Sequence, residues 1–145
     1  MRAAVLVMLG AVVSAAAAPP DVRLAVRVEG LRSDAGRVWV ALFDSGDGFP
    51  GDADAAVRRT AVPITDGVAT AVFETVPAGT YAIAVLHDED DDGRLDTGWL
   101  GIPTEGIGAS NDAQGRFGPA RFARAKMLLE GDATVTIAVV YPYPF

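Results

Sequence analysis

Acidic residues concentrate in one stretch near the middle of the chain. Four of its aspartates, Asp88, Asp90, Asp92 and Asp96, occupy positions 1, 3, 5 and 9 of a loop. Alternate carboxylates at this spacing can turn toward one centre while the backbone curls around a calcium ion. Gly93 stands at position 6, where the sharp bend favours a residue without a Cβ. Arg94, at position 7, would contribute its main-chain carbonyl oxygen, so the spacing predicts a site for Ca2+.

The loop lacks the last ligand of a helix–loop–helix calcium site. Position 12 is Trp99, where that motif has a bidentate glutamate, and a strand is expected to enter the loop. Glu105, from the connection that follows, is the candidate for the missing ligand. Magnesium suits the loop less well, because the loop offers more oxygens than magnesium usually takes from protein. The alternative is a solvated acidic turn, but Gly93 together with Asp96 favours an ion site.

Other residues that could do chemistry are few. The chain has no cysteine, which excludes a thiol nucleophile and a disulfide framework. His87 is the only histidine, and Ser110 lacks the G-x-S-x-G context of a nucleophile elbow. One alternative function is a hydrolase that uses Glu105, His87 or a calcium-bound water. A second is a carbohydrate-binding module, which would need Trp99 or Phe49 exposed on a flat face.

Composition and the first residues bear on where the protein acts. With 12 basic and 19 acidic residues in 145, and no basic cluster, the chain is a poor binder of nucleic acid or of an anionic membrane surface. Residues 1–17 read as a signal peptide, with Arg2 before an apolar run at 3–13 and small residues at 14–18. That apolar run is too short to span a bilayer. We therefore expect a periplasmic or secreted protein without a membrane span after cleavage, a monomer that meets an unknown envelope or extracellular partner.

The pattern of apolar residues predicts an all-β domain over residues 18–145. Alternation and turn signals indicate seven short strands, at 22–29, 37–43, 57–62, 68–75, 80–86, 126–130 and 133–141. The strands at 37–43 and 80–86 are apolar on both faces, which is typical of central strands. No helix is long enough for a parallel crossover, so we expect an antiparallel, immunoglobulin-like (prealbumin-like) β-sandwich with one long calcium-loop connection.

Smaller features complete the expected fold. Asp52 would cap a short helical turn at 52–56, and Pro119 would begin another at 119–125. Residues 98–118 show no periodicity and are expected to form a long connection. Tyr81, just after a tight turn, is placed to form the corner hydrogen bond of sandwich domains, or to be an ordinary core aromatic. Trp39, inside an apolar strand, is expected in the core.

Several short motifs together resemble one bacterial family. They are V-A-L-F from Val40, G-F-P from Gly48, G-T-Y-A from Gly79, H-D-E-D-D-D-G-R-L-D from His87, L-G-I-P-T-E-G-I-G-A-S-N from Leu100 and F-G-P from Phe117. This combination is similar to an uncharacterised family of exported bacterial proteins, the domain of unknown function numbered 2141. The resemblance implies a periplasmic or secreted β-sandwich and very little about activity. The family's acidic loop commonly carries asparagine where this chain has Asp90 and Asp92, a change that keeps the oxygen ligands.

The turn and tyrosine around Tyr81 also resemble sandwich modules of the carboxypeptidase-regulatory and collagen-adhesin type. Those modules are structural or binding modules, not catalysts. Taken together, the residues and the resemblance predict an exported calcium-binding β-sandwich module with a structural or partner-binding role and no catalysis.

Overall fold

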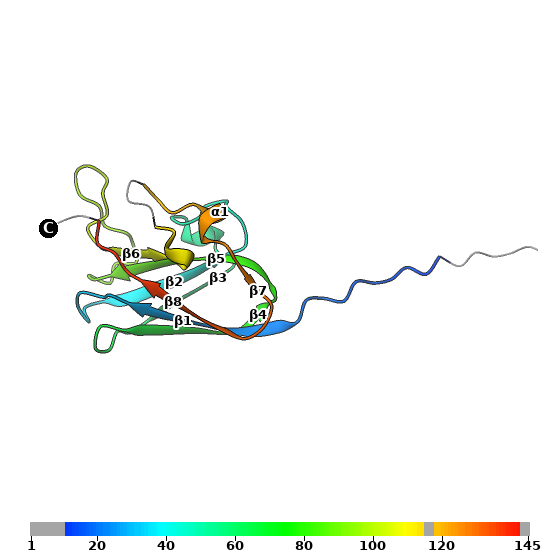
Figure 1. Ribbon diagram of the computed structural model, residues 1–145. Helices are drawn as coiled ribbons and strands as arrows, with labels where there is room; N and C mark the ends of the chain where they lie inside the picture. The colour runs from blue at the N-terminus through cyan, green and yellow to red at the C-terminus, as the bar shows by residue number, and fades with distance from the viewer. Residues whose placement is uncertain (1–10, 115–117, 143–145) are drawn as a thin grey trace, which may run out of the picture.

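The computed structural model describes residues 11–114 and 118–142. It is an all-β fold in which two sheets face each other, as Figure 1 shows, and this confirms the predicted β-sandwich. The first ten residues of the predicted signal peptide lie outside the described residues. Residues 11–20 form no secondary structure, are exposed, and extend away from the sheets (Figure 1).

The smaller sheet has three strands in the order β4-β1-β8, which are Ala69–Pro77, Asp21–Glu29 and Ala133–Ala138. β4 runs antiparallel to β1, but β8 runs parallel to it, with Leu24 opposite Ala133 and Glu29 opposite Ala138. The expectation of a purely antiparallel sandwich was therefore wrong for this pair. The chain enters β8 from the other sheet, and a crossing between sheets gives two parallel neighbours without a helix in the connection.

The larger sheet has the order β3-β2-β5-β6, and its strands are Arg58–Val62, Arg37–Phe43, Gly79–Asp88 and Gly106–Ala109; a short β7, Met127–Leu129, also pairs with β5. β6 lies within the segment expected to lack a strand. Its two glycines interrupt the apolar pattern by which a strand is predicted. Close packing explains why glycine is present at both positions. A Cβ on Gly106 would lie 2.4 Å from Val139, and one on Gly108 would lie 2.8 Å from Ile137.

Three smaller predictions have clear outcomes. The 3-10 helix Ala53–Ala55 is capped by Asp52, whose side chain accepts the N–H of Asp54 at 3.0 Å, as predicted. The hydroxyl of Tyr81 donates to the carbonyl of Pro77 at 2.7 Å, which confirms the corner hydrogen bond. Pro119 does not begin a helix, because α1 is only Phe122–Ala125.

Alternation along β2 and β5 decides which side chains reach the core between the sheets. Val40, Leu42 and Ile83 point inward and are fully buried. Their sequence neighbours point to the outer face of the larger sheet, over which α1 and its adjoining connections lie (Figure 1). There Phe49 packs edge-on against Phe43, with ring centroids 5.3 Å apart. Phe49 is therefore half-buried in an aromatic cluster and does not present a flat exposed face.

Candidate metal centre

Asp88, the last residue of β5, begins the acidic loop. Its carboxylate is fully buried and points to the outer face of the sheet, where the indole Nε1 of Trp39 donates to Oδ2 at 3.0 Å. The loop then turns back on Asp88, because Gly93 N–H donates to Oδ2 at 2.8 Å and Asp92 N–H donates to Oδ1 at 3.1 Å. Burial acts to raise the pKa of Asp88, but these three donors outweigh it and hold the pKa below its usual value.

Two further aspartates shape the loop from within. Asp90 Oδ1 accepts the N–H of Asp92 at 3.3 Å, and Asp92 Oδ1 accepts the N–H of Arg94 at 2.8 Å. Each bond reaches two residues forward, so the side chains face the concave side of a tight coil. Gly93 has a φ of 77°, which confirms the predicted need for glycine at position 6. The carbonyl contribution expected from Arg94 stays a prediction.

Glu105 closes the loop from the following connection. It is 4% exposed and precedes β6 directly. Its Oε1 accepts the N–H of Glu89 at 2.8 Å, and its Oε2 accepts the N–H of Asp96 at 3.1 Å. One carboxylate therefore joins the first and last parts of the loop. Burial raises the pKa of Glu105; the two N–H donors offset this in part, while the negative charges of Asp88 and Asp96 add to it.

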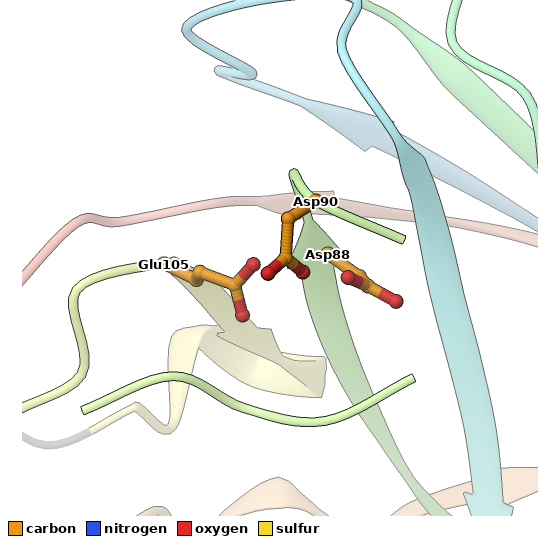
Figure 2. A group of neighbouring side chains, drawn as sticks. All are labelled: Asp88, Asp90 and Glu105. Carbon is orange, nitrogen blue, oxygen red and sulfur yellow. The ribbon is translucent and has the colours of Figure 1, made fainter. Parts of the chain in front are cut away.

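The five predicted carboxylate residues gather into two overlapping clusters. One oxygen each from Asp88, Asp90 and Glu105 lie within 4.8 Å of one another, and so do oxygens of Asp90, Asp92 and Asp96. Figure 2 shows Asp90 and Glu105 turned toward each other, with Asp88 beside Asp90. Oxygens bound to one calcium ion at about 2.3–2.6 Å are separated by no more than about 5 Å, so each cluster could supply ligands to one ion.

Asp90 belongs to both clusters and is the most exposed member of the first. Loss of hydration raises its pKa, and the nearby charges of Asp92 and Asp96 raise it further. Asp88 and Glu105 already accept backbone hydrogen bonds, but a carboxylate has roughly four lone-pair sites, which leaves each of them acceptor capacity. The arrangement can therefore bind a cation without breaking the hydrogen bonds that shape the loop.

The remaining acidic residues of the stretch turn away from the cluster and meet arginines. Glu89 pairs with Arg32, and Asp91 Oδ2 accepts from Arg37 at 2.9 Å. Arg32 lies in the connection between β1 and β2, and Arg37 begins β2, so the two pairs fasten the loop to the sandwich. The Arg32 guanidinium holds the pKa of Glu89 below its usual value, although burial opposes this. Neither arginine partner was predicted from the sequence, because the pairing of Arg37 with Asp88 depends on the register of two strands distant in sequence.

His87 points to the interior and is fully buried. Its Nε2 lies 2.9 Å from the carbonyl oxygen of Ala35, which can only accept, so Nε2 carries the proton. Its Nδ1 lies 2.7 Å from the hydroxyl of Tyr141, which in turn accepts the N–H of Arg32 at 3.0 Å. Glycine at position 36 allows the backbone before β2 to lie against the end of β5, since a Cβ on Gly36 would lie 1.9 Å from the carbonyl oxygen of Asp88.

Ser110 is likewise fully buried and bonded inside the fold. Its Oγ donates to the carbonyl of Ala125 at 2.7 Å and accepts the N–H of Ile83 at 2.9 Å. Asn111 bonds the carbonyls of the same helical turn, the closest being Lys126 at 3.0 Å. These two residues hold α1 against β5.

The aromatic candidates differ in exposure. Trp99 is 85% exposed, as a carbohydrate-stacking residue would need to be. Trp39 is half-buried on the outer face of the sheet, so its predicted place in the core between the sheets was wrong. Phe117, part of one family motif, lies outside the described residues.

Fold and site together define a β-sandwich that carries a carboxylate-rich loop at the end of a central strand. The sequence model of one family, described as "Uncharacterized protein conserved in bacteria (DUF2141)", matches residues 26–137. The chain belongs to this family, as the motifs predict, and the match includes the acidic loop and Glu105. Neither the search of curated proteins nor the search of solved structures returned a match. Among the described residues, no helix combines the length and the apolar character needed to cross a membrane.

Proposed function

We propose that this protein is an exported calcium-binding β-sandwich module with a structural or partner-binding role and no catalytic role. One observation carries the proposal: the four carboxylates chosen by loop spacing, together with Glu105, gather into two clusters that share Asp90. Glu105, a buried residue from beyond the loop, brings a further negative charge to this cluster, which favours an ion site over a solvated acidic turn. Calcium suits the site because it takes about six to eight oxygens in flexible geometry.

The ion would act as a clamp on a long connection. Glu105 bonds the N–H groups of Glu89 and Asp96, so the segment from β5 to β6 already converges on this carboxylate. Without a cation, the raised pKa of Glu105 and of Asp90 reflects repulsion and lost hydration within the cluster. A bound calcium ion relieves both effects and fixes the loop in one shape.

The hydrogen bonds of the other candidate residues support a role without catalysis. The polar atoms of His87 and Ser110 are used inside the fold, by Ala35 and Tyr141 and by Ala125 and Ile83. A general base or nucleophile needs an accessible polar atom within reach of substrate. Export is supported by the signal pattern at residues 1–17, and calcium is abundant outside the cytoplasm.

The test is calcium-dependent stability, measured on protein stripped of metal by chelator. A ligand that binds only the folded state at 100 times its dissociation constant adds about 2.7 kcal/mol, which for a domain of this size raises Tm on the order of 10 °C. Calorimetric titration with calcium should show saturable binding, with weaker binding of magnesium. Equal Tm values in calcium and in chelator would contradict the proposal.

Two neighbouring aspartates provide a matched pair of variants. Asp90→Asn removes the charge common to both clusters, whereas Asp91→Asn removes the charge paired with Arg37 outside them. Asparagine tolerates the φ of 62° at position 91. We expect Asp90→Asn to weaken calcium binding at least tenfold, about 1.4 kcal/mol, and Asp91→Asn to leave it within about threefold. Equal losses in the two variants would indicate general electrostatic attraction and not a defined site.

A further inference from the structure

The outer face of the larger sheet holds a groove of about 1310 Å³. Its floor consists of two cross-strand rows. In one row Trp39 pairs with Leu86, and Leu86 pairs with Ile107; in the other, Ala41 pairs with Ala84. The two alanines make the floor hollow, because larger residues at these positions would fill the space above the sheet.

The walls of the groove come from segments distant in sequence. Leu95, Ile102 and Pro103, from the connection between β5 and β6, form one part, and Pro50 and Pro119 form others. Most of these lining side chains are apolar, and Leu95 is 43% exposed. A concave apolar site with a few polar groups is the usual form of a small-molecule site, and such sites measure roughly 300–1,000 Å³. This groove is large enough for a ligand of that class.

Two arginines supply the charge of the groove lining. Arg59 continues the alanine row, opposite Ala41, and Arg94 leaves the acidic loop beside Leu95. Arg59 pairs at 3.3 Å with Asp54, whose side chain is 88% exposed, so this ion pair exchanges readily with water or an anion. In the described part of the chain, no carboxylate lies within ion-pair distance of the Arg94 side chain. Both groups are therefore available to an anionic ligand, although the protein as a whole is acidic.

We propose that this groove binds a small amphipathic carboxylate, with an acyl or aromatic body on the Trp39–Leu86–Ile107 row and the carboxylate at Arg59 or Arg94. An uncharged sugar fits less well, because the floor offers few hydrogen-bonding side chains. The chemistry of the groove lining indicates this class of ligand. The apolar floor favours a hydrocarbon body, and the two arginines favour an anionic head.

The groove shares a wall with the acidic loop. Gly93, Arg94 and Leu95 line the groove and follow the clustered aspartates directly. Trp39 lies on the floor and donates its indole N–H to Asp88. A cation that orders the loop would therefore order the groove wall, and we expect calcium to tighten ligand binding. This coupling rests on the proposed calcium site, but the groove itself does not.

The test uses 11-(dansylamino)undecanoic acid, a fluorescent amphipathic carboxylate, with the full chain in chelator. In the Trp99→Phe variant all tryptophan emission comes from Trp39, since the chain has two tryptophans. We expect saturable 1:1 binding with energy transfer from Trp39 to the dansyl group. Ala41→Leu, which fills the floor, should weaken binding at least tenfold, while Ala138→Leu on the exposed side of the other sheet should not change it.

The charge component is tested separately. Arg59→Gln and Arg94→Gln together should weaken binding of the carboxylate probe about tenfold and leave binding of the matching dansyl alcohol unchanged. Equal binding of the acid and the alcohol to the unaltered protein would overturn the anionic class of ligand. Absence of binding, or binding insensitive to Ala41→Leu, would overturn the groove as the site.

A second copy of the chain is the other candidate occupant. A dimer in sedimentation that Ala41→Leu dissociates, with no probe binding, would assign the groove to self-association and overturn the proposal.

Repeating the titration in calcium separates the two sites. Binding in chelator that calcium does not tighten would retain the groove as a ligand site and overturn only its coupling to the loop.

Discussion

The central strands β2 and β5 contribute side chains to both faces of the larger sheet, but the two faces differ in how completely those side chains are buried. On the inner face, Val40, Leu42 and Ile83 are fully buried against the smaller sheet. On the outer face, Trp39 and Leu86 remain half-buried and form part of the floor of a groove. Both faces are apolar, so composition does not separate them. The difference lies in what covers each face and in side-chain size, because a whole sheet fills one side and loops cover part of the other.

The same contrast is present at the end of β5, in two adjacent residues. His87 faces inward, and both of its ring nitrogens are bonded within the fold. Asp88 faces outward and accepts hydrogen bonds from the loop that gathers the carboxylates. One step along a strand therefore separates a group bonded inside the sandwich from a group that belongs to the proposed calcium site.

The largest expected effect is on the packed face. Ile83→Ala removes a fully buried side chain and should lower the free energy of unfolding by about 2–5 kcal/mol, through lost burial and a residual cavity. Leu86→Ala, on the half-buried groove face, should cost less than about 2 kcal/mol. Urea denaturation of both variants measures the difference. Equal losses would mean that the two faces are not distinct in packing.

A smaller effect is expected at the inward side of the loop junction. Tyr141→Phe removes the hydroxyl that bonds His87 Nδ1 and accepts from Arg32 N–H. Leaving the buried His87 Nδ1 without a partner should cost about 1–3 kcal/mol, while the contact of Arg32 with the ring, 4.4 Å from its centroid, persists. Tyr81→Phe, which removes a single bond to Pro77, is the control and should cost about 0.5–1.5 kcal/mol. A Tyr141→Phe variant as stable as the parent would contradict the structural role of His87.

The smallest expected effect is a pH dependence of the metal-free protein. The pKa of Glu105 is raised in the fold, so its contribution favours folding below the unfolded value of about 4.3 and is lost as pH rises through the folded pKa. In chelator, stability should therefore increase slightly as pH falls from 7 to 5. The pKa values of Asp88 and Glu89 are lowered, so their stabilisation is lost only at more acid pH.

Glu105→Gln removes the titrating group at a similar side-chain volume. Because glutamine has one accepting oxygen, the variant also loses one of the two N–H bonds, and the comparison therefore uses the pH slope and not the absolute stability. Thermal melts of both proteins between pH 5 and 7 should show a steeper slope for the parent than for the variant, which keeps the raised pKa of Asp90. If the two slopes agree, the raised pKa of Glu105 does not control this dependence.

Much of the sandwich follows from local patterns. The alternation in β1 and the apolar runs of β2 and β5 predict these strands to within about two residues, because one or both faces of each are buried. β6 was not predicted because its glycines are required by the close packing of Val139 and Ile137. These residues are distant in sequence, so no local pattern reveals the contact. The parallel direction of β8 depends in the same way on where the chain crosses between sheets.

The carboxylates of the candidate site were predictable, whereas their surroundings were not. Loop spacing selected Asp88, Asp90, Asp92 and Asp96, since ligand geometry within one loop is a local property. The bond from Trp39 to Asp88 joins residues 49 positions apart, and the pairing of Arg32 with Glu89 spans 57. Such contacts are set by strand pairing, so the second layer of the site and the groove beside it required the structure.

The most direct test of the calcium site is a crystal structure of the protein grown with calcium. We expect one ion in the acidic loop, with oxygens of Asp90 and Glu105 at about 2.3–2.6 Å and other carboxylates of the loop completing the shell. Clustered carboxylates with no ion within coordinating distance, in crystals that contain millimolar calcium, would contradict it.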